Sequence, residues 1–169
     1  MQNMAALSDD FQASENPIDL VEELVAANSW QFSRFDSDEM MVDVQGKWCQ
    51  YRLHFLWRED LNALYFSAAI DTQIPSERKM PVYELLAHVN EKMWMGHFEI
   101  CHDDMIPMFR QTCLMRGQFA TSFEQIEDLI DIALAECDRF FPAFQHVIGG
   151  GKHAEEALLM SLVDVAGAA

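Results

Sequence analysis

The chain is poor in positive charge. It has 11 Lys and Arg residues against 28 Asp and Glu, which gives a formal net charge of −17 over 169 residues. Such a charge repels phosphate backbones and anionic lipid surfaces, and nucleic-acid-binding proteins usually carry a clustered basic patch instead. The composition therefore argues against nucleic acid and membrane partners. It favours solubility and attraction to basic segments of a partner protein.

Long hydrophobic runs and closely spaced cysteines are also lacking. No stretch approaches the roughly 18 apolar residues of a membrane-spanning helix, and residues 1–16 have neither the basic nor the apolar region of a secretory signal. The cysteines are far apart and lie among apolar residues, which is typical of reduced, buried thiols. They are Cys49, Cys101, Cys113 and Cys137. These absences predict a cytoplasmic protein without a disulfide framework.

The sequence contains no internal repeat or low-complexity tract, and its length suits one domain. Half of the residues are apolar, which is enough for one sizeable core. Residues 1–14 show no periodicity and are predicted to form a mobile tail, which leaves residues 15–169 as a single α+β domain. Asn16 and Pro17 are a suitable N-cap and first helical residue, so the first helix is expected to begin there.

Residues 30–74 have the period of two that is typical of strands. Turn-like segments interrupt the alternation at 36–38, 45–47 and 58–60, which predicts four strands in a meander. In the third of these strands Tyr51, Leu53 and Phe55 fall on one face, whereas Arg52 and His54 fall on the other. One face is therefore expected to form the core.

The second half predicts a helix, two strands, a long helix and a short helix. Their expected ranges are 81–94, 97–102, 108–116, 123–148 and 152–166. Thr121 and Glu124 have the spacing of a capping box for the long helix, and Pro142 is expected to cause a kink or a break in it. The order α-β-β-β-β-α-β-β-α-α predicts an α+β fold, with helices packed on an antiparallel meander sheet of about six strands.

Four segments carry a family resemblance: VNEKMWMGHFEI, MFRQTCLMRG, FEQIEDLIDIALAECDRFFPAFQHVI and GGGKHAEEALLMSLVDVAG. Over residues 89–167 the chain resembles the YbjN family, in particular its alphaproteobacterial branch. The resemblance implies a role in the regulation of sensory transduction, and a fold similar to that of type III secretion chaperones, which are commonly dimeric. It implies no catalytic residues.

Three consecutive glycines separate the last two predicted helices. Gly149, Gly151 and Ala154 match the G-x-G-x-x-A pattern of dinucleotide sites, but that motif follows a strand and here a long helix precedes it. The preferred interpretation is a hinge formed by Gly149, Gly150 and Gly151. It would let the last helix turn back onto the domain or reach a second subunit, and no cofactor is expected.

One strand is rich in possible metal ligands. His97, Glu99 and Cys101 alternate onto one face, with His102 adjacent, a set that is chemically able to hold zinc. No second ligand pair of suitable spacing follows. A half-exposed strand face is therefore the favoured interpretation, and metal binding is the alternative.

Apolar residues also occur on strand faces opposite the predicted core. Met41, Trp48, Leu56 and Tyr65 lie there, and a sheet with apolar residues on both faces needs a second cover. The sequence thus predicts a non-enzymatic, chaperone-like or regulatory module that binds a protein segment and acts as a homodimer. A small metal-binding sensor or enzyme that uses His97, Glu99, Cys101 and His102 is the alternative. A fixed subunit of a larger assembly is a third possibility.

Overall fold

The computed structural model describes residues 16–116 and 121–167, with side-chain environments up to residue 163. The tail predicted for residues 1–14 lies outside the described part. Six strands form one antiparallel sheet in the order β1-β2-β3-β4-β6-β5. The strands are β1 (Gln31–Arg34), β2 (Glu39–Gln45), β3 (Gln50–Arg58), β4 (Ala63–Ile70), β5 (His97–Cys101) and β6 (Ile106–Leu114).

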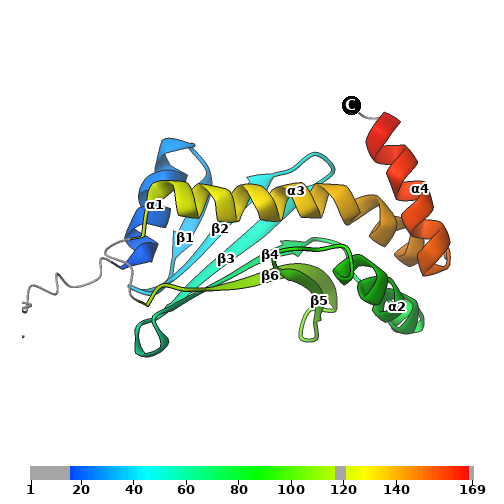
Figure 1. Cartoon of the computed structure of the whole chain (residues 1–169), viewed down its shortest axis with the longest axis horizontal. Helices are drawn as coiled ribbons and strands as arrows, with labels where there is room; N and C mark the ends of the chain where they lie inside the picture. The colour runs from blue at the N-terminus through cyan, green and yellow to red at the C-terminus, as the bar shows by residue number, and fades with distance from the viewer. Residues whose placement is uncertain (1–15, 117–120, 168–169) are drawn as a thin grey trace, which may run out of the picture.

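In the described part of the chain four α-helices accompany the sheet, in the order that the sequence predicts. They are α1 (Pro17–Ala27), α2 (Lys79–Asn90), α3 (Phe123–Ile148) and α4 (Ala154–Gly167), with two short 3-10 turns, η1 (Glu59–Leu61) and η2 (Ser76–Arg78). The helices α1 and α3 lie over one face of the sheet, and α2 and α4 lie together at one end (Figure 1). The predicted α+β fold is confirmed.

The core lies between the sheet and α3. Alternate residues of β2 and β3 face the helices, so the burial of these two strands alternates, whereas the central strand β4 is buried at most positions on both faces. Phe98 of β5 contacts Phe109 of the neighbouring strand, and Phe140 and Phe144 of α3, at ring-centroid distances of 5.4–5.9 Å. Each fully buried phenylalanine of this kind contributes about 1.5–3 kcal/mol. One hydrophobic core therefore joins the sheet to the long helix.

Helix α3 has the predicted bounds but a different cap, and the bounds of α2 and α4 differ by one to four residues from the predicted ranges. The capping box of α3 is formed by Ser122 and Gln125, one residue after the predicted pair: Ser122 Oγ accepts from Gln125 N, and Gln125 Oε1 accepts from Ser122 N. Helix α2 ends at Asn90 rather than at residue 94. The reason is that the Asn90 side chain binds both backbone groups of Phe98, at 2.7 and 3.0 Å, which ties the helix end to β5.

Helix α3 continues through Pro142. A proline at this position cannot donate to the carbonyl of Asp138, four residues earlier. That carbonyl instead accepts a hydrogen bond of 2.8 Å from the indole nitrogen of Trp48, whose ring stacks on Phe141. The helix changes direction in its orange C-terminal part without interruption (Figure 1). A side chain from the β2–β3 turn thus satisfies the carbonyl that the proline leaves free.

The glycine segment forms a turn that Arg78 holds in place. Arg78 donates from Nε to the Val147 carbonyl at 2.8 Å and from Nη2 to the Lys152 carbonyl at 3.0 Å. Gly151 has a φ of 65°, a left-handed conformation that favours glycine. After this turn α4 packs on α3 and α2 of the same chain, with Ala154, Ala157 and Ser161 buried. In the single chain α4 thus lies against its own domain, and the predicted reach to a second subunit stays a prediction.

Candidate binding face of the sheet

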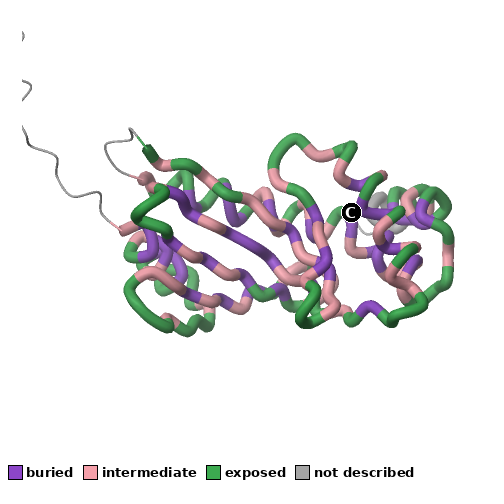
Figure 2. Tube along the Cα trace, turned by 90° about the horizontal axis from the view of Figure 1, so that it is seen from below, coloured by how far each residue is buried: buried purple, intermediate pink, exposed green. Residues whose placement is uncertain are grey.

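No helix among the described residues covers the second face of the sheet, and we call it the open face. The view from below in Figure 2 shows strands on which buried and intermediate residues alternate. Strand register places side chains of this face in rows that cross the sheet. One row joins Met41, His54, Ser67, Arg110 and His97, from β2 to β5. The next row joins Glu39, Leu56, Tyr65 and Thr112.

Polar contacts link the middle of these rows. His54 Nε2 lies 2.7 Å from Glu39 Oε1, and the His54 ring meets the edge of the Tyr65 ring at 5.8 Å. The guanidinium of Arg110 lies over the Tyr65 ring, 4.9 Å from its centroid, in a cation–π arrangement. Tyr65 is therefore held between a histidine and an arginine from neighbouring strands.

The contacts continue to the edge strand β5. Arg110 Nη1 also bridges to Glu99 Oε1 at 3.3 Å, and His97 Nε2 lies 3.6 Å from Glu99 Oε2. Ser67, at the centre of the face, is only 5% exposed although none of the described helices covers it. The charged groups of the open face are thus paired with one another. Such a surface can receive another protein without leaving single charges unpaired.

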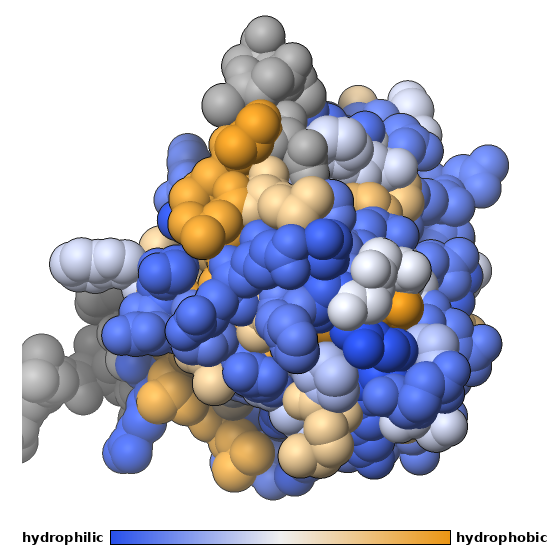
Figure 3. Space-filling model, turned by 90° about the vertical axis from the view of Figure 1, so that its right-hand side faces the viewer, coloured by the Kyte–Doolittle hydropathy of each residue, from blue (hydrophilic) through white to orange (hydrophobic). Residues whose placement is uncertain are grey.

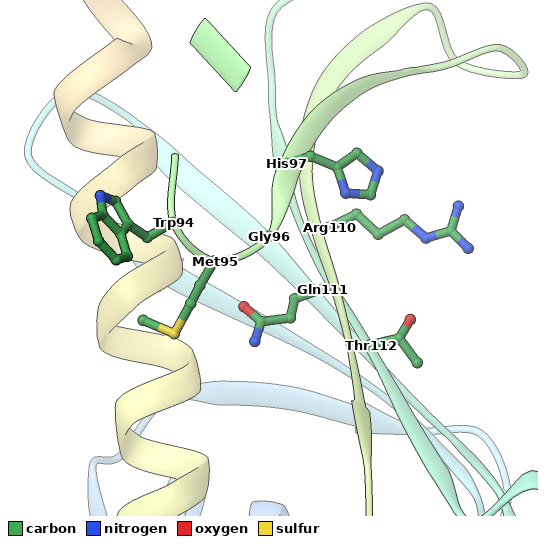
Figure 4. Close-up of a pocket in the computed structure, with 7 residues that line it drawn as sticks. All are labelled: Trp94, Met95, Gly96, His97, Arg110, Gln111 and Thr112. Carbon is green, nitrogen blue, oxygen red and sulfur yellow. The ribbon is translucent and has the colours of Figure 1, made fainter. Parts of the chain in front are cut away.

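Hollows lie at both edges of the sheet. One has a volume of about 500 Å³ and lies beside β1, where Met41 and Arg52 contribute to its wall. The other, of about 660 Å³, lies where β5 leaves β6 (Figure 4). In Figure 4 Arg110 points away from α3, whereas Met95 and Gln111 point toward it. The second hollow therefore borders both faces of the sheet.

Three of the four predicted partner-binding residues share the open face. Met41, Leu56 and Tyr65 lie there, each half-buried. Trp48 does not, because it precedes β3 and packs against Phe141 of α3. Sequence reasoning missed Arg110 and His54 as parts of the same surface. Alternation identified their faces, but only strand register shows that they flank Tyr65.

The metal-ligand strand is arranged as pairs. Glu99 is engaged by Arg110 and His97, and Cys101 Sγ lies 3.8 Å from Asp104 Oδ2. His102 follows β5 and lies near the ring of Tyr83, at 6.5 Å. Within residues 16–116 and 121–167, no group of three or more His, Cys, Asp or Glu side chains is placed to hold a metal ion. Of the four candidate zinc ligands, His97 and Glu99 lie side by side, but the four do not form one cluster.

A polar cluster on the helix side fixes the β2–β3 turn. Asp138 Oδ1 accepts from Tyr51 Oη at 2.7 Å and from Lys47 N at 3.0 Å. Burial, together with this hydrogen bond and the charge of Asp138, raises the pKa of Tyr51 well above its usual value. Burial also raises the pKa of the neighbouring Cys137 thiol, so this thiol stays protonated and unreactive at neutral pH. The cluster is structural in character.

Helix α4 presents a second apolar surface. Leu159, Leu162 and Val163 recur at helical spacing and are 68%, 62% and 71% exposed. An orange patch next to the grey C-terminal end marks this region in Figure 3. In the described part of the chain, no helix is long and apolar enough to span a bilayer.

The fold and the open face define a small α+β protein built on a sheet that helices cover on one side. The family model for YbjN, described as "Putative bacterial sensory transduction regulator", matches residues 17–146, and the chain therefore belongs to the YbjN family. Among solved structures, "Crystal structure of YbjN, a putative transcription regulator from E. coli" is similar, with 11% identity and a TM-score of 0.49. The match covers 70% of this chain and 84% of that chain. No curated protein matches the sequence.

Proposed function

We propose that this YbjN-family protein is a protein-binding regulator rather than an enzyme, and that its open sheet face binds a segment of a partner protein. The observation that carries the proposal is the composition of that face. Met41, Leu56 and Tyr65 lie among charged groups that are already paired, on a face that no helix in the described part of the chain covers. Apolar side chains between satisfied polar groups are typical of protein-binding surfaces.

The charge of the chain supports a partner segment with basic residues. The net charge of −17 attracts such a segment over distances near the Debye length of about 8 Å at physiological salt. Contact with Leu56 and Tyr65 would then supply affinity, because apolar and aromatic side chains at the centre of an interface contribute most of the binding energy. A holding function of this kind is chaperone-like.

A cytoplasmic homodimer completes the proposal. The four cysteines are free in the structure, as suits a reducing compartment. Two copies would present two open faces, so a partner with two binding segments would be held more tightly than a single copy could hold it.

Site-specific photo-crosslinking in the native host tests the open face. A benzophenone amino acid at Leu56 should yield a discrete crosslinked protein that mass spectrometry identifies. The same group at Glu23, which is exposed on α1, should not yield that product. With the identified partner purified, Leu56→Lys should weaken binding at least about tenfold, a loss of about 1.4 kcal/mol.

The matched control for binding is Leu61→Lys, which adds the same charge at a leucine that is 57% exposed in η1. Equal crosslinking from Leu56 and Glu23, or equal weakening by the two lysine variants, would refute the open face as the binding surface.

A further inference from the structure

Helix α4 turns its small residues toward the domain and its large apolar residues toward solvent. The residues of the inner side are almost fully buried: Ala154, Ala157 and Ser161. Leu159, Leu162 and Val163 lie on the other side of the helix at the same spacing of three to four positions, and all three are exposed. We call these three residues the outer stripe. Small inner residues let α4 lie close to α3, and the outer stripe adds little to that contact. A helix that is apolar on both sides is normally buried between other elements, and α4 is such a helix. From Ala157 to Val163 it carries no charged side chain. The exposure of the outer stripe shows that no described part of the chain packs over it, and Figure 3 shows it as an orange patch that faces solvent. The stripe is therefore an apolar surface that the described part of the single chain leaves uncovered.

We propose that the outer stripe binds a helix of a partner protein, and that this helix carries an apolar stripe of its own flanked by Lys and Arg. Residues three and four apart form a ridge on a helix, and such ridges pack into the grooves of another helix. Recognition of amphipathic helices uses anchors at this spacing. The outer stripe is separate from the open face, because α4 packs on α2 and α3 at one end of the domain (Figure 1). The inference therefore goes beyond the proposed function and does not depend on it.

Charge decides which occupant fits the outer stripe. Glu155 and Glu156 are exposed in the first turn of α4, directly before the stripe, and the whole chain has a net charge of −17. A second copy docked here would gather four carboxylates around one small contact, while Lys152 of each copy already pairs with Glu156 at 2.7 Å. Anionic lipid would be repelled for the same reason. A basic partner helix is the occupant that this charge attracts.

A synthetic peptide helix serves as the probe. It has about 18 residues, long enough for several helical turns, with leucines at i, i+3, i+4 and i+7 and lysines beside them. Its fluorescence anisotropy should rise on titration with wild type. Replacement of two anchors together, Leu159→Ser and Leu162→Ser, should raise the dissociation constant at least about tenfold. The side chains are exposed, so this stripe variant should keep its fold.

The matched control also replaces two exposed leucines without a change of charge. Leu61→Ser and Leu114→Ser lie in η1 and at the end of β6, and the variant that carries both should bind the peptide like wild type. A control peptide with Glu in place of Lys should not bind. These two controls separate the outer stripe from general stickiness of the chain.

The acidic turn before the stripe has a test of its own. Glu155→Gln together with Glu156→Gln should weaken binding of the lysine peptide about threefold and make it less sensitive to salt. Glu23→Gln together with Glu91→Gln removes two exposed carboxylates elsewhere and should have a smaller effect. Equal weakening by the two pairs would show that only the net charge attracts the peptide, which would overturn the charge argument.

Photo-crosslinking from position 162 in the native host tests the partner itself. The supporting result is a crosslink to another protein, mapped by mass spectrometry to a segment with helical apolar periodicity and an excess of Lys and Arg. A crosslink to a second copy of this chain, or to a segment without that pattern, overturns the proposal.

The remaining outcomes also decide against the outer stripe. Equal peptide binding by wild type and the stripe variant overturns the inference, as does an equal loss in the control with two replaced leucines. Vesicles of phosphatidylglycerol that bind wild type but not the stripe variant, with no binding of the peptide, would assign the stripe to a membrane instead. Crosslinking from Leu56 tests the open face, so either proposal can fail alone.

Discussion

Removal of one hydroxyl group tests how the β2–β3 turn is held on the long helix. Tyr51 is fully buried, and its hydroxyl donates to Asp138 Oδ1 at 2.7 Å. Tyr51→Phe keeps the ring and its packing and removes only this hydrogen bond. The expected result is a protein with the same fold and a lower free energy of unfolding.

The magnitude follows from the partners of the carboxylate. A hydrogen bond to a charged group contributes about 1.5–3 kcal/mol to stability. Asp138 keeps the amide of Lys47 as a donor and is partly exposed, so the substitution does not leave it without a partner. We therefore expect a loss near the lower end of this range, about 1.5–2 kcal/mol.

Urea unfolding followed by tryptophan fluorescence measures the loss, with an unchanged dependence on denaturant concentration. The control is Tyr83→Phe, because the half-buried Tyr83 hydroxyl has no hydrogen-bond partner in the described part of the chain. In a double-mutant cycle, Tyr51→Phe and Asp138→Asn should be coupled by about 1 kcal/mol. A loss no larger than that of Tyr83→Phe, or a coupling near zero, would refute the reasoning.

Three further substitutions test neighbouring features. Gly46→Ala should lower stability by about 1–3 kcal/mol in urea unfolding, since a Cβ there would lie 2.0 Å from the Tyr51 ring. Arg78→Ala should speed proteolysis at the glycine turn, because it removes the donor to the Val147 carbonyl. Burial raises the pKa of the Cys137 thiol in the folded state. Above the unfolded pKa of about 8.5 the thiol loses its proton only in the unfolded state, so the free energy of unfolding falls by up to about 1.4 kcal/mol per pH unit. Cys137→Ala should lose less stability than wild type in urea unfolding at pH 7.5, 8.5 and 9.5. Some alkaline loss remains in this variant, because burial also raises the pKa of the Cys49 and Cys113 thiols.

Each of these predictions has its own contrary outcome. Gly46→Ala with wild-type stability would mean that the Tyr51 ring can move aside at no cost. Arg58→Ala removes an exposed pair with Asp60 and serves as the control for Arg78→Ala, so equal proteolysis of both would exclude a specific role for Arg78. A stability difference between wild type and the Cys137 variant that does not change with pH would contradict the raised pKa.

The sequence was sufficient to predict the order of helices and strands and the buried face of the strands. Alternation over residues 30–74 predicted four strands, and the burial of Tyr51, Leu53 and Phe55 confirms the predicted core face. Both signals are local, because the side-chain period of a strand depends only on its own backbone. The helix signals were also local. The predicted capping box was one residue too early, because Thr121 and Ser122 are both able to cap a helix.

Strand order and cross-strand neighbours were decided by the tertiary structure. Nothing in the alternation of residues 97–116 shows that β6 lies between β4 and β5. That order brings Arg110 over Tyr65, although the two residues are more than forty positions apart in the sequence. Contacts of this kind depend on register, which is set by the packing of the whole sheet.

The contact between Trp48 and the helix turn at Pro142 also combines a local signal with tertiary packing. The sequence by itself determined that Pro142 would leave a carbonyl without its helical donor, because the proline ring has no N–H. The group that donates to this carbonyl instead is set by tertiary packing. The β2–β3 turn packs against α3, and the Trp48 indole nitrogen donates to Asp138 O at 2.8 Å. The chain thus determines its local elements through backbone geometry, whereas packing between distant segments decides which surfaces are closed and which remain open for a partner.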